Sequence, residues 1–274
     1  MAAQATTFQT QAAQILSENL KSKAKRILVF LVLFGLVAWS VYVTIIADTD
    51  WERIGSFSAV LKAVGRFIGI DFALIPLLFA PALETFMIAC LGTALGVVLC
   101  IPVAWMGARN ITPFKRITYP IARGLMTLSR STHEIVWALI FVSAVGLGAF
   151  PGILALAMRS IGFIAKMAAE AIEDVDPKPI EAIKAVGGNQ YQVIRYAILP
   201  QILPNVLGVI IFEWDINIRR STIMGLVGAG GLGLTFHRQM VMFNYPGVTT
   251  VILAILVLIL FGEIVSHFGR KAVM

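Results

Sequence analysis

The chain has 274 residues, of which 58% are hydrophobic and 14% are charged, and its mean hydropathy is +0.86. Soluble domains carry about a quarter of their residues as charged groups, so this composition indicates a protein with several membrane spans, surrounded by membrane lipid. The formal net charge of +7 reflects 22 Lys and Arg against 15 Asp and Glu. No basic run is interleaved with aromatic residues, so we expect no nucleic acid partner and interpret the basic residues as topology signals.

The first 26 residues are polar, and the apolar run after them is too long and too late for a cleaved signal peptide. We expect residues 1–26 to form a cytoplasmic segment, and residues 27–80 to hold a first span and an extracytoplasmic segment. In the latter, Trp51 and Phe57 alternate with basic residues. That pattern suits a helix in the outer membrane interface, and a plain connecting loop explains it equally well.

Six apolar runs are long enough to cross a hydrocarbon core of roughly 30 Å, which takes about 20 helical residues. They cover residues 27–47, 81–107, 133–150, 152–171, 202–218 and 248–267. Basic residues precede the first run, separate the second from the third, and follow the sixth. With six spans, all three basic regions fall on the same side of the membrane. The positive-inside rule therefore predicts a protein of the cytoplasmic (inner) membrane with both termini in the cytoplasm.

The predicted fold is therefore all-α and integral to the membrane, with about six transmembrane helices. The core covers residues 81–268, and residues 269–274 form a cytoplasmic tail. Segment 117–130 is expected to lie along the cytoplasmic interface before the third span. No internal repeat is visible, so we expect the two halves of a symmetric assembly to come from two copies of the chain.

A polar stretch at about residues 173–200 separates the fourth and fifth runs. Asp176 and Pro177 are typical of a helix N-cap and first turn, Gly187 and the glycine after it end that helix, and Asn189 can cap a second helix. Charged residues next to a glycine break are costly in lipid, so the stretch must lie in water. It is either a rigid knob that docks a soluble partner or an ordinary amphipathic connection.

This stretch resembles the EAA coupling loop of permease subunits of binding-protein-dependent ABC importers. The matching positions are Glu181, Ala182, Gly187, Leu199 and Pro200, with Ile183 in place of the second alanine and Ala197 where isoleucine is common. From about Leu83 to the C-terminus the chain is similar to the phosphonate-type branch. Segments 136–142, 162–170, 212–219 and 226–233 carry that similarity.

The resemblance implies a type I permease architecture, like that of the methionine importer, and a homodimeric pathway. It further implies two ATP-binding cassette subunits docked on the coupling loops, and an extracytoplasmic substrate-binding protein. ATP and magnesium would be held by the ATPase and no cofactor by this chain. The sequence agrees in lacking a Gly-x-x-x-x-Gly-Lys-Ser/Thr phosphate loop. The implied cargo is a phosphonate or a related phosphorus oxyanion.

A charged cluster follows the fifth apolar run. Ionisable groups at membrane depth usually face a bundle interior or a water-filled path, and guanidinium groups match tetrahedral oxyanions. Either Arg219 or Arg220 attracts the anion along its path, or each forms an ion pair with Glu213 or Asp215 at the outer interface. The candidate pathway residues are Arg159, Glu213, Asn217, Arg219, Arg220 and Ser221.

In the fourth span, Arg159, Lys166 and Glu173 recur every seven residues and share one helix face. Lys166 and Glu170 are expected to form a structural pair, whereas Arg159 lies deeper and is the better pathway candidate. Small residues predict close helix packing, or an unwound segment lining the path, at two further places. These are Gly92 and Gly96 in the second span, and Gly228, Gly230, Gly231 and Gly233 near the sixth.

No arrangement of residues typical of an enzyme is present. His133, His237 and His267 lack the spacing of metal ligands, and no Ser/His/Asp set or carboxylate pair stands out. We therefore expect a transport subunit without catalytic or metal-binding residues, which imports its cargo by alternating access. A permease of the same architecture for another small solute is the main alternative, and an intramembrane enzyme or scaffold a remote one.

Overall fold

The computed structural model describes residues 2–48 and 56–273, with side chains placed from Ser22 onward. Every regular element in those residues is helical, which confirms the predicted all-α class. Trp51, expected in an interface helix, lies outside the described residues. The chain separates into two compact units, Met1–Ala63 and Val64–Met274.

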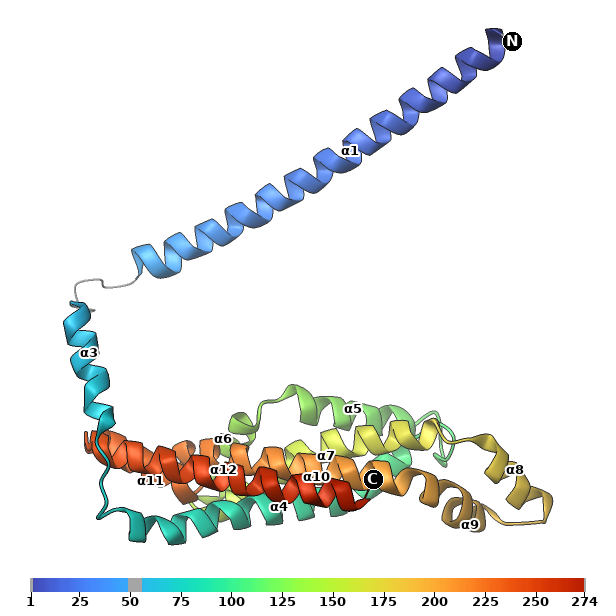
Figure 1. The fold of residues 1–274 in the computed structure, drawn as a ribbon. Helices are drawn as coiled ribbons and strands as arrows, with labels where there is room; N and C mark the ends of the chain where they lie inside the picture. Colours follow the sequence, from blue (N-terminus) through green and yellow to red (C-terminus); the bar gives the residue numbers. More distant parts are fainter. Residues whose placement is uncertain (1, 49–55, 274) are drawn as a thin grey trace. The chain divides into compact units, whose positions relative to one another are not determined.

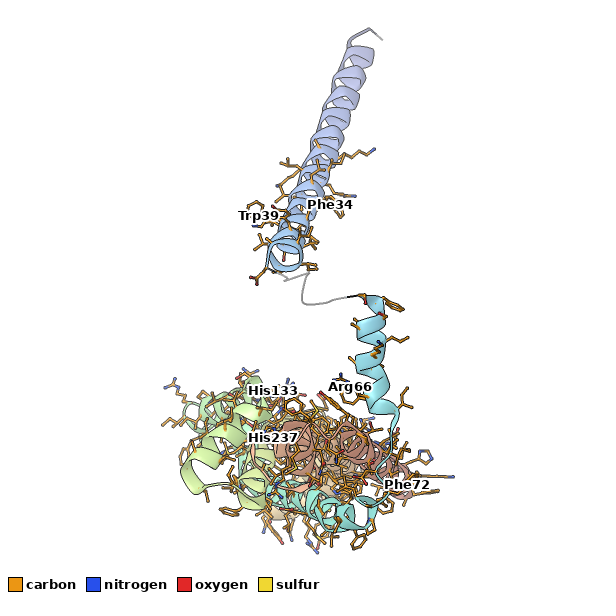
Figure 2. The ribbon with its side chains drawn as sticks, turned by 90° about the vertical axis from the view of Figure 1, so that its left-hand side faces the viewer. Phe34, Trp39, Arg66, Phe72, His133 and His237 are labelled. Atoms are coloured by element: carbon orange, nitrogen blue, oxygen red, sulfur yellow. The ribbon has the colours of Figure 1, made fainter. Side chains whose placement is uncertain are left out.

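The first unit is dominated by α1 (Ala2–Val41), which continues as a π-helix over Tyr42–Ala47. The polar segment 1–26 is thus helical as well, and the candidate span is Ser22–Ala47, with none of its most apolar window buried. Phe34 and Trp39 point outward from this helix (Figure 2). An apolar helix with an exposed surface of this kind suits a lipid environment.

α3 (Phe57–Gly65) bridges the boundary between the units, and Phe57 at its start is 83% exposed. The segment after it packs on the last helix of the second unit. The backbone N–H of Asp71 donates to Thr250 Oγ1 at 2.8 Å, and the Arg66 guanidinium lies 5.8 Å from the centre of the Tyr245 ring. These contacts explain why the second unit starts near Val64.

The second unit is a bundle of helices (Figure 1). In the picture α4, α7 and α12 run in one direction, whereas α5, α6 and α10 run in the other, and the C-terminus lies at the same end of the bundle as α8 and α9. The helices are α4 (Phe79–Gly107), α5 (Thr118–Ser131), α6 (Glu134–Val145), α7 (Ala149–Glu173), α8 (Pro177–Ala185), α9 (Gln190–Val193), α10 (Leu199–Met224), α11 (Gly231–Val241) and α12 (Tyr245–Val273).

Five helical stretches of the described residues are long and apolar enough to cross a membrane: Ser22–Ala47, Ile75–Gly107, Ala149–Glu173, Gln190–Val227 and Tyr245–Val273. The remaining predicted span, 133–150, corresponds to α6, which has 12 residues and is about 18 Å long at 1.5 Å per residue. By itself α6 is too short to cross.

α5 and α6 lie one after the other along α7. Ser129 of α5 bonds to the middle of α7, Arg123 reaches Glu173 at the C-terminal end of α7, and buried Ala138 of α6 packs beside Ala155. Segment 117–130 was expected along the membrane surface. In the structure Ala122, Met126 and Ser129 of this segment are buried in the bundle. Thr132 and His133 separate α5 from α6.

The boundary between α6 and α7 is set by two glycines. Gly146 and Gly148 have φ values of 97° and 139°, which L side chains rarely adopt, so the helix ends there. α7 begins at Ala149, three residues before the expected start, and Pro151 is tolerated because it lies in the first turn.

α10 is longer than the predicted span 202–218, and it is continuous with the segment before it. A second coupling helix was expected to run to Leu199 and Pro200, but those residues begin α10 instead. Pro200 has no N–H to donate, and the π-turn Ile194–Ile198 accommodates it without a break. The short helix α9 is therefore continuous with α10 through this π-turn.

Candidate functional site

Close contact between α4 and α7 builds the base of the site. A Cβ atom added at Gly92 would lie 2.7 Å from Leu156 Cβ, and one added at Gly96 would lie 2.7 Å from Ser160 Cβ. These two glycines therefore allow the backbones of α4 and α7 to approach each other within one chain. The contact places Thr93 and Ser160 side by side with α10.

A buried polar network joins the three helices at this contact. Asn217 of α10 donates through Nδ2 to Thr93 Oγ1 and to Ser160 Oγ, both at 2.9 Å. Ser160 in turn donates to Glu213 Oε1 at 3.1 Å. Asn217, Ser160 and Glu213 are completely buried, so the sequence's polar cluster is turned into the bundle rather than toward lipid.

Two arginines and two glutamates extend the network. Arg220 Nη1 donates to Glu213 Oε1 at 2.8 Å and to Asn217 Oδ1 at 3.2 Å. Glu134, the first residue of α6, lies between two cations, with Oε1 3.5 Å from Arg220 Nε and Oε2 3.8 Å from Arg159 Nε. The four formal charges of Glu134, Arg159, Glu213 and Arg220 cancel, as expected for ions held away from water.

Two atoms of this network have no hydrogen-bond partner among the described residues. They are Arg159 Nη1 and Glu213 Oε2, and both are buried. Each unmet buried polar atom costs about 1–3 kcal/mol. The network is therefore not saturated, and a further polar group entering it would find a free donor and a free acceptor.

The arginine next to this network has a different environment. Arg219 Nη2 donates to Asp215 Oδ2 at 2.8 Å, and its side chain is 43% exposed. Both arginines thus form the ion pairs that were the alternative to a pathway role, but only Arg220 joins the buried network. Ser221 is buried and donates to the carbonyl of Ile218 at 2.8 Å, which satisfies it within α10.

A cavity of about 420 Å³ lies between α5 and α7, beside Arg159. Its lining residues are Arg123, Met126, Thr127, Arg130, Ser131, Arg159 and Lys166. Four of them are cations and none is acidic. Arg130 was interpreted as a topology signal, but the structure places it on this cavity at the C-terminal end of α5.

The polar stripe of α7 continues from the cavity toward the end of the bundle that carries α8. Lys166 and Glu170 lie 3.5 Å apart, as predicted for a structural pair. Glu173 pairs instead with Arg123 of α5 at 2.8 Å, and it accepts the backbone N–H of Arg109 at 2.8 Å. These contacts tie α5 and the end of α4 to α7.

The EAA-like segment forms a helical elbow, defined here as α8, α9 and the corner between them. The Asp176 side chain accepts the backbone N–H of Lys178 at 3.0 Å, as predicted for an N-cap. At the corner Gly187 has a φ of 85°. Asn189 and Gln192 then form a capping box at the start of α9. Each cap therefore rigidifies one arm of the elbow.

The elbow projects beyond the end of the bundle (Figure 1). Glu181 and Ala182 are exposed, and Val186 at its tip is 85% exposed. Its inner face, by contrast, carries Ile180 and Ile183, which pack against the core cluster that includes Val193 and Ile198. The elbow is thus anchored on one side and open on the other, a shape suited to a soluble partner.

The glycines after α10 form a tight irregular segment. Gly228, Gly230 and Gly231 have φ values of 93°, 84° and 70°. A Cβ atom at Gly233 would collide with the carbonyl of Thr222, and the backbone N–H of Leu232 donates to Thr85 Oγ1 at 2.8 Å. These glycines pack the start of α11 against α4 and α10.

Sequence reasoning missed four residues of the site. Thr93, Glu134 and Ser160 belong to the buried network, and Arg130 lines the cavity. Glu134 offered a weak signal, because an acid directly before an apolar run is expensive in lipid unless it is paired. No spacing rule links it to Arg159 or Arg220, which lie on other helices.

Comparison with known proteins agrees with this architecture. Residues 96–271 match the family described as "Binding-protein-dependent transport system inner membrane component". The phosphite transport system permease protein PtxC of Stutzerimonas stutzeri is 35% identical over 240 residues, covering 88% of this chain and 86% of that protein. The phosphate-import permease protein PhnE of Mycolicibacterium smegmatis is 35% identical over 221 residues, and the match spans 81% of this chain and 40% of that longer protein.

Among solved structures, an inward-facing form of the MetNI methionine ABC transporter is similar in fold. The TM-score is 0.65 at 23% identity, and the match covers 75% of this chain and all of that one. The fold is thus the type I permease fold, as expected. The chain belongs to the family of inner membrane components of binding-protein-dependent transport systems, and it is a multi-pass permease subunit rather than an enzyme.

Proposed function

We propose that this permease moves a phosphorus oxyanion, such as a phosphonate or phosphite, across the cytoplasmic membrane by alternating access. The observation that carries the proposal is the agreement of two relatives, named for phosphite and phosphate transport, that are 35% identical over more than four-fifths of this chain. Selectivity for one oxyanion among several is expected to reside largely in the binding protein.

The chemistry of the bundle interior supports this cargo. Arg159 and Arg220 lie among buried residues of α7 and α10, and a guanidinium presents forked donors that match the oxygens of a tetrahedral anion. Charged side chains inside a membrane bundle are expensive even when they are paired, so they need a functional or structural reason. Transit of an anion supplies such a reason.

The elbow supports the expected partners. Two copies of the chain would form the pathway, and two ATP-binding cassette subunits would each receive one elbow. ATP and magnesium would be held by those subunits, and a substrate-binding protein would deliver the anion from outside. Because α9 is continuous with α10, displacement of the elbow would move the helix that carries Glu213 and Arg220.

The orientation of the termini follows from the number of crossings. Counting α5 and α6 as one crossing gives six, which would put both termini on the cytoplasmic side together with the elbow. The basic residues Arg109, Lys115 and Arg116 would then lie on that side too, as the positive-inside rule requires. Protease accessibility of tags at each terminus in sealed vesicles tests this orientation.

The cargo is tested in proteoliposomes that contain the permease with its ATPase, enclosed ATP and external binding protein. Labelled phosphite, methylphosphonate, phosphate, D-methionine and histidine are offered separately. ATP-dependent uptake of a phosphorus oxyanion supports the proposal. Uptake of an amino acid but of no oxyanion overturns the proposed cargo and leaves the assignment as a permease intact. Uptake at the same rate with and without ATP overturns the proposed coupling to ATP hydrolysis.

A further inference from the structure

The cavity between α5 and α7 shares only Arg159 with the buried network, and its lining carries four cations and no acidic residue. Three of its four cations have acidic partners outside the lining. Arg123 pairs with Glu173 at 2.8 Å, Lys166 with Glu170 at 3.5 Å, and Arg159 with Glu134 at 3.8 Å.

Arg130 is the exception. Within the residues that the structure describes, it forms no ion pair, and the cavity therefore keeps at least one uncompensated cation. Its neighbours Thr127 and Ser131 add two hydroxyl groups to the same wall. Hydroxyls and guanidinium groups together are the usual donors for a phosphorus oxyanion.

The cavity lies at the depth where an anion in transit is hardest to stabilise. Arg159 is ten residues after Ala149, the first residue of α7, and so about 15 Å from that end of a 25-residue helix. Ionisable groups at such a depth usually face a bundle interior or a water-filled path. A volume of about 420 Å³ gives room for a small hydrated anion.

Glu134 holds Arg159 loosely. At 3.8 Å the contact between Oε2 and Nε is longer than a charge-assisted hydrogen bond, and the same carboxylate is shared with Arg220 at 3.5 Å. Arg159 also has one buried nitrogen without an acceptor. A better-placed anion in the cavity can therefore compete with Glu134 for Arg159.

We propose that this cavity is a transit site for the phosphorus oxyanion, bound by Arg130, Arg159 and Lys166, with Glu134 as the internal anion that the cargo displaces from Arg159. The inference rests on the proposed function and adds the residues of the site. Competition by Glu134 keeps the site weak, and a transit site must be weak because a tightly held anion would not be released.

The same chemistry would attract the phosphate of an anionic lipid headgroup. We assign the site to the free oxyanion, because Arg159 on the cavity wall also contacts Glu134, which joins it to Arg220 of the buried network. The two sources differ in their dependence on lipid composition, and the experiment below uses that difference.

The test uses the complete complex in nanodiscs, with radiolabelled phosphite and inorganic phosphate as probes and without nucleotide. Arg130→Gln should weaken equilibrium binding about tenfold, because one charge-assisted contact is lost. Glu134→Gln should strengthen binding several-fold, because the competing carboxylate is gone. Arg116→Gln is the matched control, since Arg116 is exposed and does not line the cavity.

Uptake by the same variants in proteoliposomes completes the test. Arg130→Gln should lower oxyanion uptake about tenfold, Arg130→Lys should restore part of it, and the control Arg116→Gln should take up the oxyanion at the wild-type rate. Arg130 is exposed and unpaired, so its loss should not unfold the protein.

The opposite signs of the two binding effects support the transit site. If the wild type takes up the oxyanion and the Arg130→Gln variant does so at the same rate, the transit site is overturned and the proposed cargo is not. Absence of oxyanion uptake by the wild type overturns both. A third outcome is that oxyanion binding vanishes when phosphatidylcholine is replaced by phosphatidylglycerol, while uptake by Arg130→Gln is unchanged. That outcome assigns the cavity to an anionic lipid headgroup and overturns the transit site.

Discussion

The buried network and the elbow contain the same chemical groups in opposite surroundings. Glu213 has a side-chain exposure of 1% and reaches Arg220 at 2.8 Å, whereas Glu181 on α8 is exposed on the elbow. In the network each charge depends on its partner, because water is not available to replace it. On the elbow water solvates every charge, so a residue there can be selected for its partner protein without cost to the fold.

The largest expected effect comes from removing a buried charge. Glu213→Ala leaves Arg220 without its closest anion, and breaking a buried pair in this way costs about 3–5 kcal/mol of unfolding free energy. Denaturant unfolding in detergent measures the loss. The matched control is Glu181→Ala, and equal stabilities of the two variants would contradict the contrast between network and elbow.

The next effect concerns the helix contact beneath the network. Gly96→Val pushes Cβ and its methyl groups into Ser160, so α4 and α7 must separate, and overpacking of this kind costs about 1–3 kcal/mol. Thermal unfolding monitored by circular dichroism reports the change. Gly124→Val is the control, because no atom lies within 4 Å of a Cβ added at Gly124. A Gly96 variant as stable as its control would show that the contact is not needed.

A smaller and more local effect is expected at the corner of the elbow. Gly187→Val forces an L side chain into a φ of 85°, which costs about 1–2 kcal/mol, although no neighbouring atom blocks the space. Amide hydrogen exchange should accelerate in α8 and α9 and stay unchanged in α4 and α7. Association with the ATPase should fall as well. Ala185→Val, on the same exposed helix, is the control, and unchanged exchange in both variants would refute a strained corner.

The smallest effect on stability is expected for Glu181→Ala, which should lie within about 0.5 kcal/mol of the wild type because the side chain is solvated. Its effect should appear in coupling instead. We expect less ATPase to co-purify with the variant and slower ATP-dependent uptake. Lys178→Ala at the start of α8 provides a comparison. Normal ATPase binding by the Glu181 variant would remove this residue from the docking surface.

Much of the fold could be predicted from the sequence, because helix formation and capping depend on residues that are close together along the chain. Long apolar runs located α4, α7, α10 and α12, and the N-cap at Asp176 and the glycine at the corner located the elbow. The third span was the exception. The 12-residue α6 is too short to cross alone, and only the structure shows that α5 and α6 both pack on α7.

Some residues of the candidate site could likewise be predicted from the sequence, and others could not. Glu213, Asn217 and Arg220 were recognisable because charged groups inside an apolar helix are expensive, and that expense can be read from neighbours in the sequence. The sequence could not separate Arg220 from Arg219, since adjacent residues on a helix point about 100° apart and only the packing of α10 decides which one faces inward.

By itself, the sequence determined a helical membrane protein with a water-exposed elbow, because hydropathy, capping and glycine placement act over a few neighbouring residues. Its resemblance to the binding-protein-dependent permeases then indicated the transport role. Only the tertiary structure decided that Glu134 of α6, Arg159 of α7 and Arg220 of α10 share one network, and that Arg130 opens onto a cationic cavity. Ion pairing depends on distances of a few ångströms between side chains of different helices, and those distances are set when the helices pack.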